Sequence, residues 1–339
     1  MRHSVVAAAL AAAILAACGG GGGGDQGSEN PGRDGFIVYS VSPTVQSPGH
    51  IFRIRPDGTE KLELPPGGRD GDPAFNSDGK TIVFSSSRDS PNPTGFGAST
   101  HLYKMSIDGT NPTRVTANPL SCTELHGHFS ADDRMITFTM RCDDPIDYRI
   151  HRINADGSGQ APVVSDHPAL AARHSEVFSA FGPNNRIVFA ADLSGNAIGN
   201  PQPAKVDLFV MDADGRNTQR LTNLAPEGRN VFDGRLSVLG ASVYFVTVNM
   251  NGFDGQLETI NVDGTGRTLL YRIPNLAFAD SVGASPRDTQ FAPSPNGHFM
   301  AFVRHDQSSG NQVLMTALID GTSATAIDAS GLAAAPAWK

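Results

Sequence analysis

Short runs of alternating apolar and polar residues recur along this chain, and each of them leads into the same turn dipeptide. The runs read HIFRIRP, HLYKMSI, YRIHRINA, DLFVMDA, QLETINV and QVLMTALI. Alternation with a period of two predicts a half-buried β-strand, and Asp-Gly between two such runs is typical of a tight hairpin. The pairs recur about every 50 residues, at Asp57-Gly58, Asp108-Gly109, Asp156-Gly157, Asp214-Gly215, Asp263-Gly264 and Asp320-Gly321.

A second hairpin is predicted upstream of the Asp-Gly turns. Its clearest copy is DPAFNSDGKTIVFSSSRD, with strands at 73–75 and 81–86 around a turn at 76–79. Related copies read HGHFSADDRMITFTMR, SAFGPNNRIVFAAD and APSPNGHFMAFVRHD, and a weaker one, DGRLSVLGASVYFVTVN, begins at Asp233. Each unit therefore predicts four antiparallel strands in about 50 residues, which is one blade of a β-propeller.

The two ends of the repeat region complement each other. Residues 35–64 contain two predicted strands but no strand of the "DPAF" type before them. The last residues, APAWK at 335–339, resemble that missing strand. The sequence therefore predicts an all-β, six-bladed propeller over residues 35–339, closed by its C-terminal strand, with Trp338 as a core anchor at the closure.

The repeat resembles that of the TolB-type propeller family. Residues 72–116 carry the resemblance, including the segment HLYKMSIDGTNPTRVT, and it extends over 35–339. It implies the propeller fold and suggests a protein-interaction role in the periplasm. TolB proteins carry an additional N-terminal α/β domain and no lipid anchor. A glycine-rich segment occupies that position here, so the resemblance does not extend to a role in the Tol-Pal system.

The N-terminal segment is predicted to lie outside the fold and to be cleaved off as a signal peptide. Residues 5–17 are apolar or small, a run of the length of a signal-peptide core and too short to span a membrane. The segment ends in Leu15-Ala16-Ala17-Cys18, which resembles the bacterial lipobox. An ordinary signal peptide with an incidental cysteine is the alternative.

The lipobox resemblance implies a membrane anchor. It predicts a signal peptide at 1–17, a lipid attached to Cys18, and a flexible tether at 18–34 that includes six consecutive glycines. Gly19 after the cysteine favours the outer membrane in that family of signals. We therefore expect the protein on the periplasmic side of the cell envelope, lipid-anchored, in the outer membrane.

The two remaining cysteines are predicted to form a disulfide. Cys122 and Cys142 flank a hairpin whose turn is centred near 131–133, with Phe129 expected opposite Met135. In that register Cys122 lies directly opposite Cys142, within disulfide reach. Two free thiols are the alternative, although an exported chain favours the bond.

Polar residues gather on the predicted innermost strands, which line the central channel of a propeller. Alignment on the aromatic anchors places Asp72, His126, Asp233 and Gln290 at one equivalent position, and Glu176 or Phe178 at that position in the fourth blade. The candidate channel ligands are Asp72, His126, His128, His174, Glu176, Asp233 and Gln290. Such a ring could bind a divalent cation or a polar ligand, or it could be a solvated channel without a metal.

Few other chemical signals are present. The net charge of −8 argues against a nucleic-acid partner. The chain has no G-x-S-x-G motif, phosphate-binding loop or dinucleotide fingerprint, so no catalytic residue, metal or cofactor is predicted. Two long loops rich in proline and glycine, at 87–100 and 193–205, are expected on one rim and suit partner recognition.

These observations lead to one main functional prediction and two alternatives. We expect a non-enzymatic scaffold that binds an envelope protein or peptide. The first alternative is a metal-dependent, carbohydrate-active enzyme resembling the oligogalacturonate lyases, whose related propeller has a metal site in its channel. Here the region of His126, His174 and Gln290 invites that comparison. The second is an ectodomain or surface lipoprotein that binds a small molecule.

Overall fold

A computed structural model describes most of the chain beyond the tether. The described residues are 34–44, 46–95, 97–142, 148–171, 174–194, 205–231, 237–249, 254–273, 291–305 and 311–339, all within one compact unit. Cys18 and two candidate channel residues, Asp233 and Gln290, lie outside them. In the described part, no helix is both long and apolar enough to cross a membrane.

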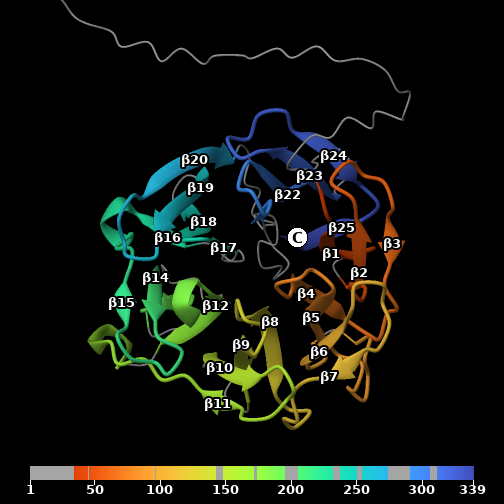
Figure 1. Cartoon of the computed structure of the whole chain (residues 1–339), viewed down its shortest axis with the longest axis horizontal. Helices are drawn as coiled ribbons and strands as arrows, with labels where there is room; N and C mark the ends of the chain where they lie inside the picture. Colours follow the sequence, from red (N-terminus) through yellow and green to blue (C-terminus); the bar gives the residue numbers. More distant parts are fainter. Residues whose placement is uncertain are drawn as a thin grey trace, which may run out of the picture. The chain divides into compact units, whose positions relative to one another are not determined.

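The described residues form antiparallel sheets arranged in a ring (Figure 1). Three sheets of four strands follow one another along the chain. They are β4 (Asp70–Phe75), β5 (Thr81–Ser86), β6 (His101–Ser106) and β7 (Thr113–Arg114); β8 (Thr123–Phe129), β9 (Met135–Arg141), β10 (Arg149–Asn154) and β11 (Ala161–Pro162); and β12 (Ser175–Phe181), β13 (Ile187–Asp192), β14 (Val206–Met211) and β15 (Gln219–Arg220).

Two larger sheets complete the arrangement. One has five strands: β16 (Arg229–Val231), β17 (Ser237–Leu239), β18 (Ser242–Asn249), β19 (Asp254–Asn261) and β20 (Thr268–Ile273). The other has eight: β21 (Phe291–Pro293), β22 (Phe299–His305), β23 (Gln312–Leu318), β24 (Thr325–Asp328), β25 (Leu332–Trp338), β1 (Ile37–Ser42), β2 (His50–Ile54) and β3 (Leu62–Glu63). The described helices are short 3-10 turns, at Pro168–Leu170, Pro183–Asn185 and Ala225–Glu227.

The eight-stranded sheet consists of two groups of four strands. The group β21–β24 and the group of β25 with β1–β3 are joined by the parallel pair Gln312 and Leu332. The all-β prediction is thus confirmed. The count of six blades stays a prediction.

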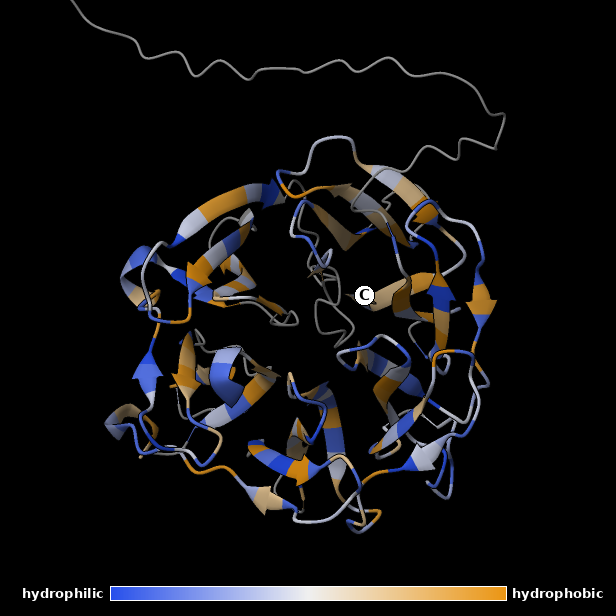
Figure 2. Ribbon diagram, in the orientation of Figure 1, coloured by the Kyte–Doolittle hydropathy of each residue, from blue (hydrophilic) through white to orange (hydrophobic). Residues whose placement is uncertain are grey.

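Each sheet packs its faces against neighbouring sheets. Ile82 and Phe84 of β5 belong to a buried cluster with Val38 and Ile51 of β1 and β2, whereas Val83 faces the other way. Val83 packs in a cluster with Phe138 of β9. Successive side chains of a strand point to opposite faces, so a middle strand buried on both sides needs apolar residues at consecutive positions. The resulting hydrophobic bands on the strands are visible in Figure 2.

The C-terminal strand completes the sheet that begins at the N-terminal end of the described chain, as predicted. Strand β25 pairs with β1, with Trp338 opposite Ile37. The side chain of Trp338 is buried, and its indole N–H donates to the Asp34 carbonyl at 3.1 Å. The pairing thus joins chain segments about 300 residues apart in the sequence.

The Cys122–Cys142 disulfide is present, but the register behind its prediction was wrong by one residue. Phe129 pairs with Ile136 and not with Met135. A β-bulge between Leu125 and His128 then shifts the ladder by one residue, which brings the two cysteines opposite each other. The two errors of the prediction, the turn register and the missing bulge, cancelled.

The fifth repeat departs most from the predicted pattern. The innermost partner of β18 is split into β16, which pairs with residues 247–249, and β17, which pairs with residues 242–244. Strand β16 lies before Asp233, where the sequence pattern placed the start of this hairpin. The connection between β16 and β17 lies outside the described residues.

Candidate functional site

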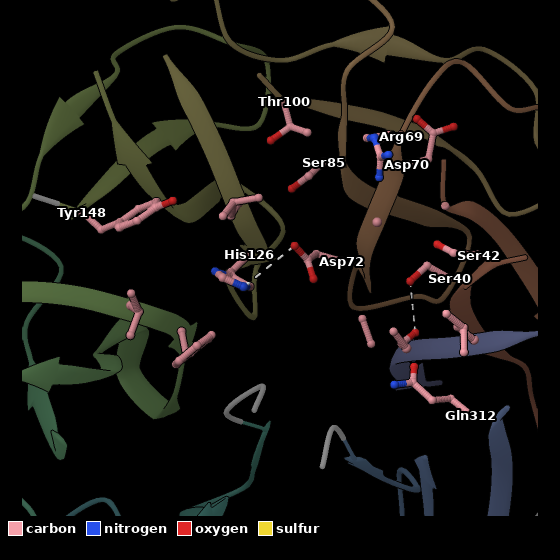
Figure 3. Close-up of a pocket in the computed structure, with 18 of the residues that line it drawn as sticks. Ser40, Ser42, Arg69, Asp70, Asp72, Ser85, Thr100, His126, Tyr148 and Gln312 are labelled. Carbon is pink, nitrogen blue, oxygen red and sulfur yellow. Dashed lines mark hydrogen bonds and ion pairs between the residues drawn. The ribbon is translucent and has the colours of Figure 1, made fainter. Parts of the chain in front are cut away.

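Two cavities lie along the innermost strands. We call the first the polar cavity; it has a volume of about 450 Å³. Its lining includes Ser40, Asp70, Asp72, Ser85, Thr100, His126, Tyr148, Phe178, Gln312 and Ala335 (Figure 3). The second, the aromatic cavity, measures about 530 Å³ and is lined by Phe75, Phe129, Phe181 and Trp338, several prolines, and His128.

A repeated β-bulge positions the side chains of the polar cavity. The ladders of β4, β8, β12 and β25 with their neighbours all shift at corresponding places. At each shift one residue has a positive φ: Asp72 at 50°, His126 at 56°, Phe178 at 54° and Ala335 at 51°. A bulge re-aims a side chain, and a non-glycine residue in this backbone region stores strain. All four residues line the polar cavity.

Three of these residues form a contact chain across adjacent sheets. Nε2 of His126 lies 3.8 Å from Oδ2 of Asp72, and the two side chains are 14% and 17% exposed. The His126 ring meets the edge of the Phe178 ring, with 4.8 Å between centroids. The bulges thus place a carboxylate, an imidazole and a phenyl ring beside one another.

The structure brings together only part of the predicted channel set. Asp72 and His126 converge in the polar cavity, and Phe178, rather than Glu176, takes the equivalent place in the fourth repeat. His128 lines the aromatic cavity instead. Asp233 and Gln290 lie outside the described residues.

His174 and Glu176 form a buried contact between two sheets and not a part of the cavity wall. Both are buried, and Nε2 of His174 lies 3.0 Å from Oε1 of Glu176. The other carboxylate oxygen accepts the backbone N–H of Ile150, on the preceding sheet, at 3.0 Å. Neither residue lines either of the two cavities, and the pair links two sheets.

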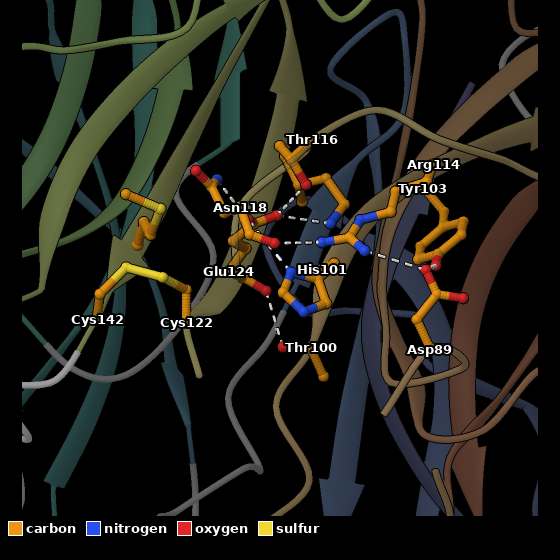
Figure 4. Close-up of polar contacts among 12 residues, drawn as sticks. Asp89, Thr100, His101, Tyr103, Arg114, Thr116, Asn118, Cys122, Glu124 and Cys142 are labelled. Atoms are coloured by element: carbon orange, nitrogen blue, oxygen red, sulfur yellow. Dashed lines mark hydrogen bonds and ion pairs between the residues drawn. A yellow bond between two sulfur atoms is a disulfide. The ribbon is translucent and has the colours of Figure 1, made fainter. Parts of the chain in front are cut away.

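Glu124 is a similar link that sequence reasoning missed. Its carboxylate accepts the backbone N–H of Leu102 at 2.9 Å and hydrogen bonds from Thr116 and Asn118, with His101 at 3.4 Å (Figure 4). Burial raises the pKa of Glu124, but the hydrogen bonds from these partners outweigh burial and lower the pKa. An acidic residue two positions before the bulge residue, as at Asp70, Glu124 and Glu176, was the available signal.

The cavities have different chemical capacities. The described residues contain no group of three or more His, Cys, Asp or Glu side chains arranged to hold a metal ion. Asp72 and His126 supply one carboxylate and one imidazole, and hydroxyl groups surround them. The polar cavity therefore suits a ligand that forms hydrogen bonds, whereas the aromatic cavity offers mainly apolar contact.

Comparison with solved structures shows the fold of this chain. No family model and no curated protein sequence matches the chain. Among solved structures, TolB from Acinetobacter baumannii is similar with a TM-score of 0.63 and 15% identity, covering 91% of this chain and 68% of that one. A chain of a nidogen/laminin complex is similar with a TM-score of 0.58 and 12% identity, covering 89% of this chain and 98% of that one.

A third similar structure belongs to an enzyme. An oligogalacturonate lyase from Vibrio parahaemolyticus matches with a TM-score of 0.51 and 9% identity, covering 85% of this chain and 78% of that one. At such identities the likeness concerns the fold alone. The chain has a TolB-like β-propeller fold. The predicted β-propeller fold is thereby confirmed.

The lowered pKa of Glu124 predicts a pH-dependent contribution to stability. Its charged form is favoured in the folded state, so the contribution is complete above the ordinary pKa of 4.5 and is lost as pH falls through the lower folded value. We expect Glu124→Gln to lower the free energy of unfolding by about 1.5–3 kcal/mol at pH 7, and the difference from wild type to shrink below pH 4.5. Denaturant titrations between pH 7 and pH 3 measure both.

Glu60→Gln is the matched control, because that carboxylate is exposed and paired with Arg55 at the surface. Its expected cost is below about 1 kcal/mol. A Glu124→Gln deficit that stays constant from pH 7 to pH 3 would show that the carboxylate charge does not carry this link.

Proposed function

We propose that this protein is a lipid-anchored, non-enzymatic propeller of six blades that binds an envelope protein, peptide or small polar ligand at its polar cavity. The observation that carries the proposal is the convergence of Asp72, His126 and Phe178 from three sheets on one cavity. A site built at sheet ends around a channel is rigid, because each side chain is held by a paired strand.

The packing between strand groups supports the count of six blades. The described residues contain six buried hydrophobic clusters, and each joins two adjacent groups of four or five strands. One cluster joins β18 and β19 to β21–β23, and another joins β1 and β25 to β22 and β23. Each group is thereby covered on both faces, as blades of a closed ring would be.

The envelope location is proposed from the N-terminal sequence. The segment before Cys18 has the pattern of a lipoprotein signal, and the glycine run after it provides a tether. A protein held in this way can present a cavity to periplasmic partners without inserting into the bilayer.

Replacement of the anchor cysteine tests the location. We expect Cys18→Ser to move the protein from the membrane fraction to the soluble periplasmic fraction, because the acyl chains supply the membrane affinity. Fractionation with antibody detection measures the shift, and [³H]palmitate labelling should disappear. Absence of label on the wild type, or label that persists on Cys18→Ser, would contradict the lipid anchor.

A photo-cross-linking amino acid tests the binding role. Placed at Ser42, which lines the polar cavity, it is expected to give a covalent adduct in intact cells. Ser158, on the exposed β10–β11 turn, is the matched control position. Gel mobility reveals a protein adduct, and the intact mass reveals a small one. Equal labelling at both positions, or none, would refute binding at this cavity.

The rival function is a metal-dependent, carbohydrate-active enzyme. The approach of His126 to Asp72 is the observation that favours it, since imidazole and carboxylate are common metal ligands. Metal analysis of the purified protein is expected to show far less than one ion per chain. Stoichiometric Mn, Zn or Ca that is lost in His126→Ala, but retained in the exposed control His298→Ala, would favour the enzyme and overturn the proposal.

A further inference from the structure

Asp72 is a partly buried carboxylate that lines the polar cavity. Its side chain is 17% exposed, and its one ionic neighbour among the described residues, Nε2 of His126, is 3.8 Å away, beyond hydrogen-bond distance. No described residue donates a hydrogen bond to it. A carboxylate on a cavity wall that receives no hydrogen bond from the described residues can accept donors from a ligand.

The other acids at the same ends of the inner strands contrast with Asp72. Asp70, two residues earlier, accepts the backbone N–H of Gly67 at 2.9 Å and has Arg88 at 3.5 Å. Glu124 and Glu176 accept backbone N–H groups of adjacent sheets. Glu124 and Glu176 thus link adjacent sheets, whereas Asp70 and Asp72 both line the polar cavity (Figure 3), where Asp70 is paired with Arg88.

Two hydroxyl groups of the polar cavity add acceptors. Ser40 donates its hydroxyl proton to the carbonyl of Ala334 at 3.3 Å, and Thr100 donates its own to the carbonyl of Glu124 at 2.9 Å. A hydroxyl whose proton is already used offers lone pairs only. These two hydroxyls therefore offer hydrogen-bond acceptors in the wall that also carries Asp72.

We propose that the polar cavity binds the basic side chain of a peptide, with Asp72 as the counter-ion of its ammonium or guanidinium group. This rests on the proposed binding function and specifies its ligand. An ammonium carries three donors and a full positive charge, which match a carboxylate and surrounding hydroxyl oxygens. Val177, Phe178 and Leu332 line the same cavity and suit the methylene stem of lysine.

The cationic side chains of the cavity favour a peptide over a simple polyamine. Arg69 donates its guanidinium protons to the carbonyls of Gln46, Ser47 and Gly95, and Arg141 lies over the Tyr148 ring at 5.0 Å. Both positive charges stay in the cavity wall and would repel a polycation. A peptide with a basic residue next to an acidic one can pair its positive charge with Asp72 and its negative charge with the arginines of the wall.

Isothermal titration of the mature protein with short peptides tests the proposal. The probes are acetyl-Ala-Lys-Glu-amide and acetyl-Ala-Nle-Glu-amide, which differ in the ammonium, and cadaverine, a diamine without the acid. We expect the lysine peptide to bind at least 10-fold more tightly than either other probe. Asp72→Asn should weaken lysine-peptide binding by at least 10-fold, about 1.4 kcal/mol.

Asp108→Asn is the matched control, since it makes the same charge change on an exposed outer turn, and its affinity should stay within twofold of wild type. Asparagine tolerates the positive φ of position 72, and Asp72→Gly serves as a second variant if Asp72→Asn folds poorly. Near-UV circular dichroism checks the fold of each.

Three results would overturn the proposal: equal binding of the norleucine peptide, unchanged affinity of Asp72→Asn, or displacement of the lysine peptide by Mn²⁺ alone. The last would assign Asp72 to a metal. If the Ser42 cross-linker captures a partner while the lysine peptide fails to bind, the binding role stands and only the ligand assignment is wrong.

Discussion

The packing of each sheet between two neighbours is the constraint on which the rest of this structure depends. A twisted four-stranded sheet with two apolar faces is unstable alone, and each face is covered by the next group of strands. Consecutive apolar residues such as Ile82 and Val83 serve opposite neighbours for this reason. At the two ends of the described chain, β25 pairs with β1, and the residues of both strands pack against β22 and β23.

The repeated bulge converts this packing into a site. A regular innermost strand would alternate its side chains between the two neighbouring sheets. The extra residue at Asp72, His126 and Phe178 breaks the alternation and turns one side chain per strand toward the cavity. The backbone strain at these positions is compensated by pairing on both sides of the bulge. Chemical variety among equivalent positions then arises without any change of fold.

Acidic residues divide into two roles at this end of the sheets. The carboxylates of Glu124 and Glu176 accept backbone N–H groups of the neighbouring sheet. Both are buried, and low polarity strengthens each hydrogen bond. Asn230 plays the same part toward Val206 with its amide oxygen at 3.1 Å. Asp72 accepts no backbone N–H within the described residues. Its carboxylate is therefore available to a ligand, unlike those of Glu124 and Glu176.

Local sequence determined most of the strands, the hairpin turns and the repeat, because period-two alternation and Asp-Gly turns act over a few residues. Comparison of the repeats predicted the partner of the C-terminal strand. Local sequence also led to the Cys122–Cys142 pair, although through a register that the bulge had to correct. Tertiary structure alone decided that Phe178 rather than Glu176 faces the cavity, and that Glu124 links two sheets. Bulges and inter-sheet hydrogen bonds depend on how separate hairpins meet. The partners of these contacts are far apart in the chain, and the acid that recurs two residues before the bulge does not by itself show which backbone N–H it meets.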